Sequence, residues 1–303
     1  MSRVIHYTIK QEDDGRIAAR YLRGIGYSHR NLSWLKEDPC GVCLNRSPIH
    51  LNARLHAGDL LTISIREDDR PSLDAVPLDF QILYEDEDLL VVDKPAGMPL
   101  HPSFQNTDNT LANALTWYYQ EKGIPFVFRC SNRLDRDTSG LTIVSRHRIA
   151  AGMISEMGVR REIRREYLAL VRGSIVPPAG TIDAPIGREE GSIIARRIDP
   201  VNGERAVTCY RVLKEQAGLS LVSLVLETGR THQIRVHMKS IGHPLIGDHL
   251  YNPDDRLLIS RQALHAHRLT FVHPIKRIPL SFASPLPDDM ARLIEEMDHT
   301  GKV

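Results

Sequence analysis

Hydrophobic and polar positions alternate with two periods along this chain, and the period changes from one part to another. Up to residue 66 the hydrophobic runs are short and switch between a helical period and a period of two. Ser28 precedes one helical run, where a serine can cap the first turn, and Leu61 and Ile63 alternate with polar residues as in a half-buried strand. Helices are predicted at residues 16–23 and 28–36, and strands at residues 42–45 and 61–65. Residues 1–66 are therefore interpreted as a small α/β module.

The pattern changes at residues 67–79, which are acidic and contain Pro71 and Pro77. Proline and charge without hydrophobic periodicity are typical of a linker. From residue 80 to about residue 295, longer strands are mixed with a few amphipathic helices, which indicates an α+β domain. Strands are predicted at residues 80–84, 89–92, 141–144, 167–171, 207–213 and 219–227, and helices at residues 111–118, 150–157 and 231–241.

Charge is distributed unevenly, although the formal net charge of the 303 residues is only +1. Residues 67–93 contain ten acidic residues and one basic residue, whereas residues 129–172 contain ten basic and five acidic residues. A polyanion would avoid the first stretch and favour the second. Two solvated surfaces of opposite sign would explain the same counts, so charge alone does not identify a nucleic-acid-binding protein.

The cysteines and the N-terminus indicate where such a chain functions. Four cysteines are too few for a disulfide scaffold, and Cys40 and Cys43 have only half of the spacing of a zinc site. The first 14 residues lack the apolar region of a secretion signal, and no run reaches the roughly 18 apolar residues of a membrane helix. We therefore expect a soluble cytoplasmic protein without a structural metal.

The densest group of candidate functional residues lies at residues 132–141, which read Asn-Arg-Leu-Asp-Arg-Asp-Thr-Ser-Gly-Leu. Asp135 and Asp137 stand here beside Arg133 and Arg136. A carboxylate near arginines keeps its charge and can act as a nucleophile or a base. A loop with surface ion pairs is the alternative interpretation.

Two further segments carry basic residues in positions that suit an anion. Arg230, His232 and Arg235 stand near the predicted start of a helix, where free N–H groups can bind a phosphate or a carboxylate. A capped helix with solvated arginines would look the same. Arginines 160, 161, 164 and 165 precede Tyr167, which opens an apolar strand. These arginines can contact phosphates, and the tyrosine ring can either stack on an unpaired base or belong to the core.

Together these segments resemble the RluA-type family of RNA pseudouridine synthases. Residues 132–141 are similar to the family motif usually written His-Arg-Leu-Asp-x-x-Thr-Ser-Gly-Leu, with Asn132 in place of the usual histidine. The other family motifs resemble residues 94–102, 165–171, 228–237 and 242–248, and they occur in the family's order. Within the N-terminal module, residues 42–45 and 55–63 resemble the S-four-like RNA-binding fold, which is named after a ribosomal protein.

The resemblance implies a fold and a reaction. The fold would be a mixed, largely antiparallel central sheet with flanking helices over residues 80–295. The reaction would detach uracil from its ribose at N1 and rejoin it through C5, without a cofactor or metal. Asp135 would be the catalytic residue, attacking the sugar, attacking the base, or deprotonating the sugar. The base must leave the RNA stack for this to happen.

The same resemblance implies roles for other residues. Tyr167 would lie against the flipped uracil and help to move the last proton, and Arg235 would pair with Asp135. Arg133 would fill the gap left by the base, and Leu245 or Ile246 would supply an apolar wall of the uracil pocket. RNA contacts are expected from Arg133, Arg136, Arg160, Arg161, Arg164, Arg165, Arg230 and His232.

Other interpretations remain open at this point. The chain could be an RNA-binding protein that has lost its activity, although the intact Asp135, Tyr167 and Arg235 argue against that. A metal enzyme would need ligands among His232, His237, His243, His265 and His267, whose spacing is not that of a helical pair. The partner is expected to be structured RNA bound by a monomer. Ribosomal RNA is the favoured substrate and transfer RNA the alternative.

Overall fold

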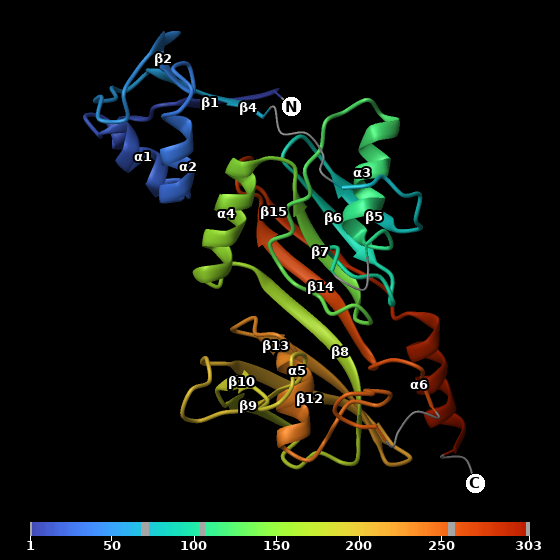
Figure 1. The fold of residues 1–303 in the computed structure, drawn as a ribbon. Coiled ribbons are helices and arrows are strands. Elements are labelled where there is room, and N and C mark those ends of the chain that lie inside the picture. The colour runs from blue at the N-terminus through green and yellow to red at the C-terminus, as the bar shows by residue number, and fades with distance from the viewer. Residues whose placement is uncertain (1, 68–72, 104–106, 254–257, 301–303) are drawn as a thin grey trace.

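A computed structural model of the chain describes residues 2–67, 73–103, 107–253 and 258–300 (Figure 1). Within these ranges it contains a four-stranded sheet, a nine-stranded sheet and a separate two-stranded hairpin. One helix between the two larger sheets, α4 (Arg148–Val159), packs against both. The α+β class with a mixed central sheet and flanking helices is confirmed.

The four-stranded sheet forms the N-terminal module and has the order β1-β4-β2-β3. Its elements are β1 (Ser2–Thr8), α1 (Ala18–Gly24), α2 (His29–Leu35), β2 (Val42–Leu44), β3 (Ser47–Pro48) and β4 (Leu60–Arg66). The predicted cap is confirmed, since Ser28 Oγ accepts the Asn31 N–H at 3.0 Å and the Asn31 side chain accepts the Ser28 N–H at 3.0 Å. Leu61 and Ile63 are buried, as their alternation predicted.

The module packs on α4 and is not separated from the rest of the chain by solvent. Figure 1 shows α4 next to α2 of the module. Ile149 and Met153 of α4 are buried in the module's own hydrophobic cluster. The Asn31 side chain donates to the Arg148 carbonyl at 3.0 Å, and Arg3 pairs with the buried Asp88 at 2.9 Å. The division into residues 1–66, 67–79 and 80–295 stays a prediction, and so does the S-four-like fold. Residues 68–72 of the predicted linker lie outside the described residues.

The large sheet has the order β5-β6-β7-β14-β8-β13-β12-β9, and β15 pairs with β14. Among the described strands, only β7 and β14 pair in parallel, and they do so through just two residue pairs, His265 with Ser139 and Ala266 with Gly140. The strands are β5 (Gln81–Glu85), β6 (Leu89–Lys94), β7 (Ser139–Ser145), β8 (Arg164–Arg172), β9 (Ala179–Asp183), β12 (Val207–Gln216), β13 (Leu219–Leu226), β14 (Leu264–Val272) and β15 (Pro279–Ala283).

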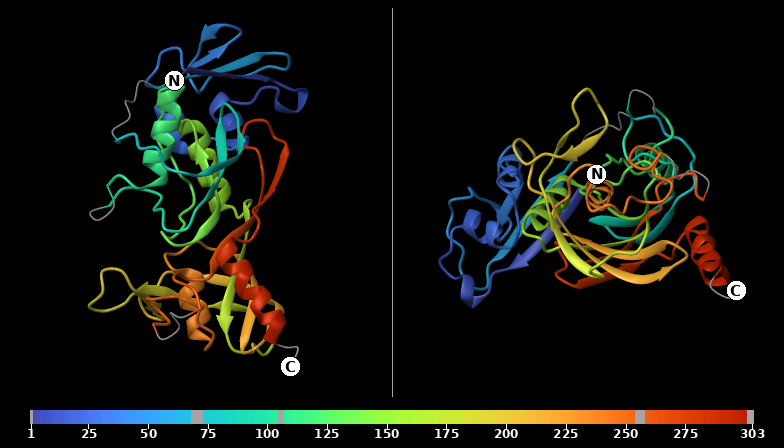
Figure 2. Two further views of the ribbon diagram at one scale, coloured as in Figure 1. Left: turned by 90° about the vertical axis from the view of Figure 1, so that its right-hand side faces the viewer. Right: turned by 90° about the horizontal axis from the view of Figure 1, so that it is seen from below.

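Helices cover both faces of this sheet (Figure 2). On one face, α3 (Leu111–Glu121) and α5 (Gln233–Ser240) share a core with Tyr167, Ala169 and Val171 of β8. On the other face, α6 (Asp288–Thr300) packs against Leu170 of the same strand, and α4 packs further along. Successive side chains of a strand point to opposite faces, so β8 is buried on both sides.

The predicted hairpin of residues 80–92 and the predicted helices at α3, α4 and α5 are confirmed. Helix α5 starts at Gln233, two positions later than predicted. The sequence interpretation missed β1, β9, β14, β15, α6 and the hairpin of β10 (Ile186–Arg188) and β11 (Arg196–Ile198). No described helix is long and apolar enough to cross a bilayer.

Candidate active site

Asp135 and Arg235 form an ion pair although 100 positions separate them in the sequence. Asp135 lies in the loop before β7, and Arg235 lies in the first turn of α5. Arg235 Nη1 donates to Asp135 Oδ2 at 3.0 Å, as the resemblance predicted. The Asp135 side chain is 25% exposed, whereas that of Arg235 is only 8% exposed. The carboxylate is thus open to a ligand while its counter-ion is enclosed by protein.

A second carboxylate, Asp248, holds the other edge of the same guanidinium. Arg235 Nε and Nη2 donate to the two Asp248 oxygens at 2.7 and 2.8 Å. Asp248 is completely buried, and its Oδ1 also accepts the N–H groups of Leu250 and Tyr251. Burial alone would lower the pKa of Arg235, but the hydrogen bonds and charge of Asp248, followed by those of Asp135, raise it above its ordinary value. Asp248 therefore orients a permanent cation toward Asp135.

The loop of Asp135 is joined tightly to the sheet at Gly140. This glycine has a φ of +106°, and a Cβ atom there would lie 2.3 Å from the Ala266 carbonyl oxygen in β14. Any other residue would push β7 away from β14. Just before it, the Thr138 N–H donates to the Asp135 carbonyl at 3.1 Å. Glycine is thus required at position 140, where the loop that presents Asp135 joins the sheet.

Lys94, at the end of β6, ties a second loop to the Asp135 loop. Its buried Nζ donates to the carbonyls of Pro95, Met98 and Arg136 at 2.8, 2.8 and 2.9 Å. Burial lowers the pKa of Lys94 to about 7, against the opposing charges of nearby aspartates. Residues 94–102 therefore contribute to the site through the backbone positions that Lys94 fixes.

A pocket opens beside Asp135, and the buried Tyr167 forms part of its wall. Burial raises the pKa of Tyr167, so its hydroxyl is protonated at neutral pH and can donate a hydrogen bond. The remaining lining residues are Arg133, Leu134, Thr138, Leu226, Arg230, His232, Gln233, Ile234, Arg235 and Leu264. The pocket combines an apolar side with a charged end, which suits a planar polar base.

The apolar wall differs from the one expected. Leu245 and Ile246 are completely buried and do not belong to the lining of this pocket, which is formed instead by Leu134, Leu226 and Leu264. The Ile246 N–H donates to the Leu170 carbonyl, so this segment runs along the edge of β8. Leu245 and Ile246 consequently fall into two different core clusters.

His232 is linked to Tyr251, a residue to which the sequence interpretation assigned no role. His232 has a left-handed backbone, with φ of 56°, immediately before α5. The Tyr251 hydroxyl accepts the Arg196 N–H at 2.8 Å and lies 2.9 Å from His232 Nδ1. On the other side of the imidazole ring, His232 Nε2 lies 3.9 Å from Asp135 Oδ1. The Tyr251 ring also lies under the Arg235 guanidinium, at 5.0 Å.

The expected RNA-contacting arginines lie in three places. Arg133 and Arg230 line the pocket, and Arg230 pairs with Glu204. Arg136 is exposed and forms a two-point pair with Asp137 at 2.9 Å. Arg160, Arg161 and Arg164 are exposed where α4 leads into β8, and Arg165 follows them on the same face of β8 as Tyr167. Arg161 pairs with Glu227 at 2.6 Å, so part of the charge of this cluster is neutralised.

Asn132 has a structural task in this chain. Its side-chain oxygen accepts the Ile143 N–H at 3.0 Å and the Thr142 hydroxyl at 3.1 Å, and thereby joins the start of the Asp135 loop to β7. An amide can make these contacts without any charge. The replacement of the family's usual histidine thus leaves the Asp135 loop attached to the sheet.

Comparisons with known proteins agree with this geometry. The family model described as RNA pseudouridylate synthase matches residues 88–240. The "Uncharacterized RNA pseudouridine synthase YjbO" of Bacillus subtilis is 40% identical over 92% of this chain and 98% of its own length. The chain belongs to the RNA pseudouridylate synthase family. Members of this family are isomerases, and Asp135, Tyr167 and Arg235 lie within the matched residues.

Two other members extend the comparison. The "Ribosomal large subunit pseudouridine synthase D" of Escherichia coli O6:H1 is 41% identical over 78% of this chain and 76% of its own length. The solved structure of "Human RNA Pseudouridylate Synthase Domain Containing 1" has a TM-score of 0.57 and 28% identity, and it covers 73% of this chain and 95% of its own. The large sheet and its helices are therefore those of a pseudouridine synthase domain.

One group with the spacing of metal ligands occurs in the described part of the chain, and it lies outside the pocket of this pseudouridine synthase. Asp86, Asp88 and His273 bring their ligand atoms within 4.8 Å of one another. Asp86 already pairs with His273 and Lys276, and Asp88 with His147 and Arg3. The group is thus a network of hydrogen-bonded polar side chains that fastens β1 to the loop between β5 and β6.

Proposed function

We propose that this enzyme converts uridine to pseudouridine in large-subunit ribosomal RNA, with Asp135 as its catalytic carboxylate. The observation that carries the proposal is the partly exposed Asp135 held by Arg235 at the charged end of a pocket that contains Tyr167. The choice of ribosomal RNA is supported by relatives named as ribosomal large subunit pseudouridine synthases. The enzyme acts in the cytoplasm as a monomer and requires no cofactor.

The proposed roles follow from the position of each group. A uracil in the pocket packs against Tyr167 and reaches Asp135, whose carboxylate is oriented by the hydrogen bond from Arg235. The bond from N1 to the ribose breaks, the base turns, and a bond from C5 to the ribose forms, after which C5 loses a proton and N1 gains one. Asp135 can attack the sugar, attack the base or deprotonate the sugar. Arg133, at the mouth of the pocket, occupies the space that the base leaves in the RNA.

The proposal is tested by mapping pseudouridines in total RNA from cells with and without this protein. One or more sites in large-subunit ribosomal RNA should disappear with the protein, whereas loss of sites in transfer RNA alone would overturn the choice of substrate. The purified protein should then modify a transcript that contains the mapped uridine. A chelator should leave this rate unchanged, and inhibition would favour a metal enzyme.

The role of Asp135 is tested with a matched pair of variants. Asp135→Asn should abolish turnover, because an amide neither attacks carbon nor takes a proton. Asp137→Asn, two positions away and paired with the exposed Arg136, should change the rate much less. Measurable turnover by Asp135→Asn on the mapped RNA would refute the assignment.

A further inference from the structure

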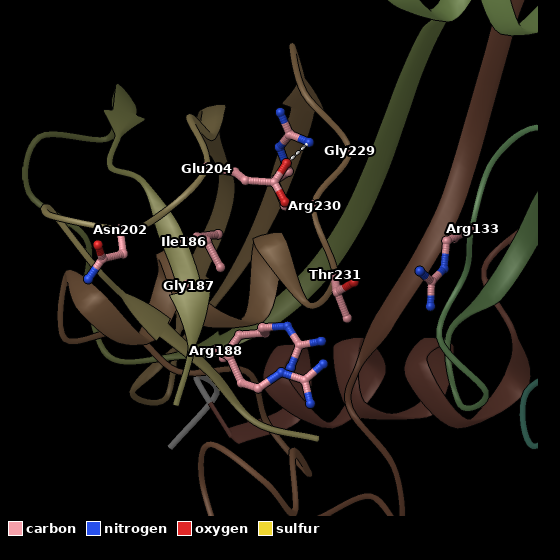
Figure 3. A pocket seen from close by; sticks show the side chains of 10 residues that line it. Arg133, Ile186, Gly187, Arg188, Asn202, Glu204, Gly229, Arg230 and Thr231 are labelled. Atoms are coloured by element: carbon pink, nitrogen blue, oxygen red, sulfur yellow. Dashed lines mark ion pairs between the residues drawn. The ribbon is translucent and has the colours of Figure 1, made fainter. Parts of the chain in front are cut away.

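We infer that a second, arginine-lined pocket next to the uracil pocket holds a phosphate of the RNA chain beside the target uridine. The inference rests on the proposed function. This pocket lies between the β10–β11 hairpin and the turn at residues 229–231, with Arg133 on its far side (Figure 3). Its volume is about 390 Å³. In this pocket the hairpin arginines Arg188 and Arg196 face the opening of the uracil pocket.

The lining of this pocket favours an anion. Four arginines line it, namely Arg133, Arg188, Arg196 and Arg230. Glu204 also lines it and pairs with Arg230, while the other three arginines form no ion pair with any residue that the structure describes. Three positive charges are therefore left without a carboxylate partner. Small-molecule pockets are mostly apolar, so a cationic pocket of this size points to a phosphate-bearing ligand.

The two hairpin arginines are held in place but retain free donors. Arg188 Nη1 donates to the Ile193 carbonyl at 3.3 Å, and Arg196 Nη1 donates to the Ile194 and Ala195 carbonyls at 3.0 and 3.1 Å. A guanidinium carries five N–H groups, so most of them remain for a ligand. Figure 3 shows the Arg188 side chain reaching toward Thr231, and Arg133 lies beyond it across the pocket.

The hairpin itself is packed closely and is not a loose arm. A Cβ atom on Gly187 would lie 2.6 Å from Asp199 Oδ2, and one on Gly203 would lie 2.4 Å from the Asp199 carbonyl. The Arg196 N–H is also bound by the Tyr251 hydroxyl. The backbone that carries the two arginines is thus held in place before any RNA arrives, which lowers the entropic cost of binding.

Continuity with the uracil pocket identifies the ligand as a chain phosphate. Arg133 and Arg230 line both pockets. A nucleotide whose base enters the first pocket must therefore place a neighbouring part of its backbone near the second. Arginine binds phosphate oxygens by two parallel hydrogen bonds and reads no sequence in doing so. The pocket accordingly anchors the backbone while the first pocket selects the base.

The first test compares charge changes on the two faces of the hairpin. The double variant Arg188→Gln/Arg196→Gln removes two charges from the pocket, and Arg197→Gln is the control, since neighbouring strand residues point to opposite faces. Binding of the RNA fragment that contains the mapped uridine is measured across a salt series. The double variant should bind about tenfold more weakly. The slope of log affinity against log salt should fall by about 0.7 per lost contact.

The second test locates the phosphate. Linkages around the target uridine are replaced one at a time by neutral methylphosphonates, and binding is measured for the wild type and the double variant. At the linkage that the pocket holds, the neutral replacement should weaken RNA binding by the wild type. It should not weaken binding by the double variant any further, because the effects of coupled changes are not additive. Additive losses at every linkage, or equal effects of Arg197→Gln and the double variant, would overturn the inference. Failure of the proposed function would show differently, as the absence of any modified uridine.

Discussion

Replacing Asp248 by asparagine should reveal how one guanidinium serves two carboxylates. Arg235 makes two hydrogen bonds to the completely buried Asp248, at 2.7 and 2.8 Å, and one to the partly exposed Asp135 at 3.0 Å. Asparagine has the same shape but no charge, and its NH₂ group would face N–H donors. Breaking a buried pair in this way costs about 3–5 kcal/mol of folding free energy.

The chemistry should suffer as well, for a different reason. Without Asp248 the guanidinium is no longer oriented, and its charged hydrogen bond to Asp135 weakens or is lost. Such a bond contributes about 1.5–3 kcal/mol, so the single-turnover rate at saturating RNA should fall by about tenfold to 150-fold. Asp135→Asn should show the opposite balance, with no turnover and a small loss of stability, because Arg235 would keep its buried partner.

A matched control lies elsewhere in the chain. Arg261 donates to both oxygens of Asp289 at 2.6 and 2.8 Å, which is the same two-point geometry, but the Asp289 side chain is 32% exposed. Asp289→Asn should therefore cost only about 1–2 kcal/mol, including the favourable position of the carboxylate at the start of α6. Urea unfolding can be followed by fluorescence of Trp117 in α3, with Trp34 of the module replaced by phenylalanine.

Two results would refute this reasoning. Equal destabilisation by Asp248→Asn and Asp289→Asn would mean that burial does not decide the strength of the pair. A stable Asp248→Asn variant with the wild-type rate would mean that Asp248 does not orient Arg235.

Three further predictions use other contacts. Deleting residues 1–66 should weaken RNA binding and leave a folded, active domain. Because Ile149 and Met153 become exposed, the free energy of unfolding measured in urea should fall by roughly 3–6 kcal/mol. An insoluble product, or unchanged RNA affinity, would contradict the two-domain view. Replacing Arg160, Arg161 and Arg164 by alanine should weaken RNA binding and lower the slope of log affinity against log salt by somewhat under about one unit per lost contact, with the smallest share from Arg161 because it already pairs with Glu227. Arg235→Ala should bind RNA nearly normally and fail in single turnover. Normal RNA binding by the triple variant would mean that the three arginines form only a solvated surface. Tyr251→Phe keeps the ring under Arg235 but removes the hydroxyl beside His232, so the single-turnover rate should fall about fivefold while RNA affinity persists.

Local patterns predicted the elements whose periodicity is regular. The cap at Ser28, the hairpin of β5 and β6 and the helix α3 each depend on residues close together in the sequence. Strand β14 was missed because His265 and His267 interrupt its apolar pattern. Their partners, Ser139 and Ser284, come from distant segments, so the sequence near β14 does not indicate that His265 is buried and His267 half-buried in a sheet.

In the site, too, contacts that depend on residues far apart in the sequence were harder to predict than local ones. The resemblance placed Arg235 beside Asp135, but the wall at Leu245 and Ile246 was wrong because their segment pairs with β8. Asp248 and Tyr251 could have been suspected from an acid and an aromatic residue following an apolar run. Their roles depend on Arg235 and Arg196, which only the folded chain brings to them.

The two-residue junction between β7 and β14 has a consequence for how substrate and enzyme fit together. Asp135 belongs to the half of the sheet that ends at β7, whereas Tyr167 and Arg235 belong to the half that begins at β14. The ion pair between Asp135 and Arg235 therefore bridges the seam where backbone hydrogen bonding between the halves is thinnest. Strain applied across this seam changes the separation of these two groups before it changes the interior of either half. We therefore expect an RNA that touches both halves to set the separation of Asp135 and Arg235 by the way it binds across the sheet.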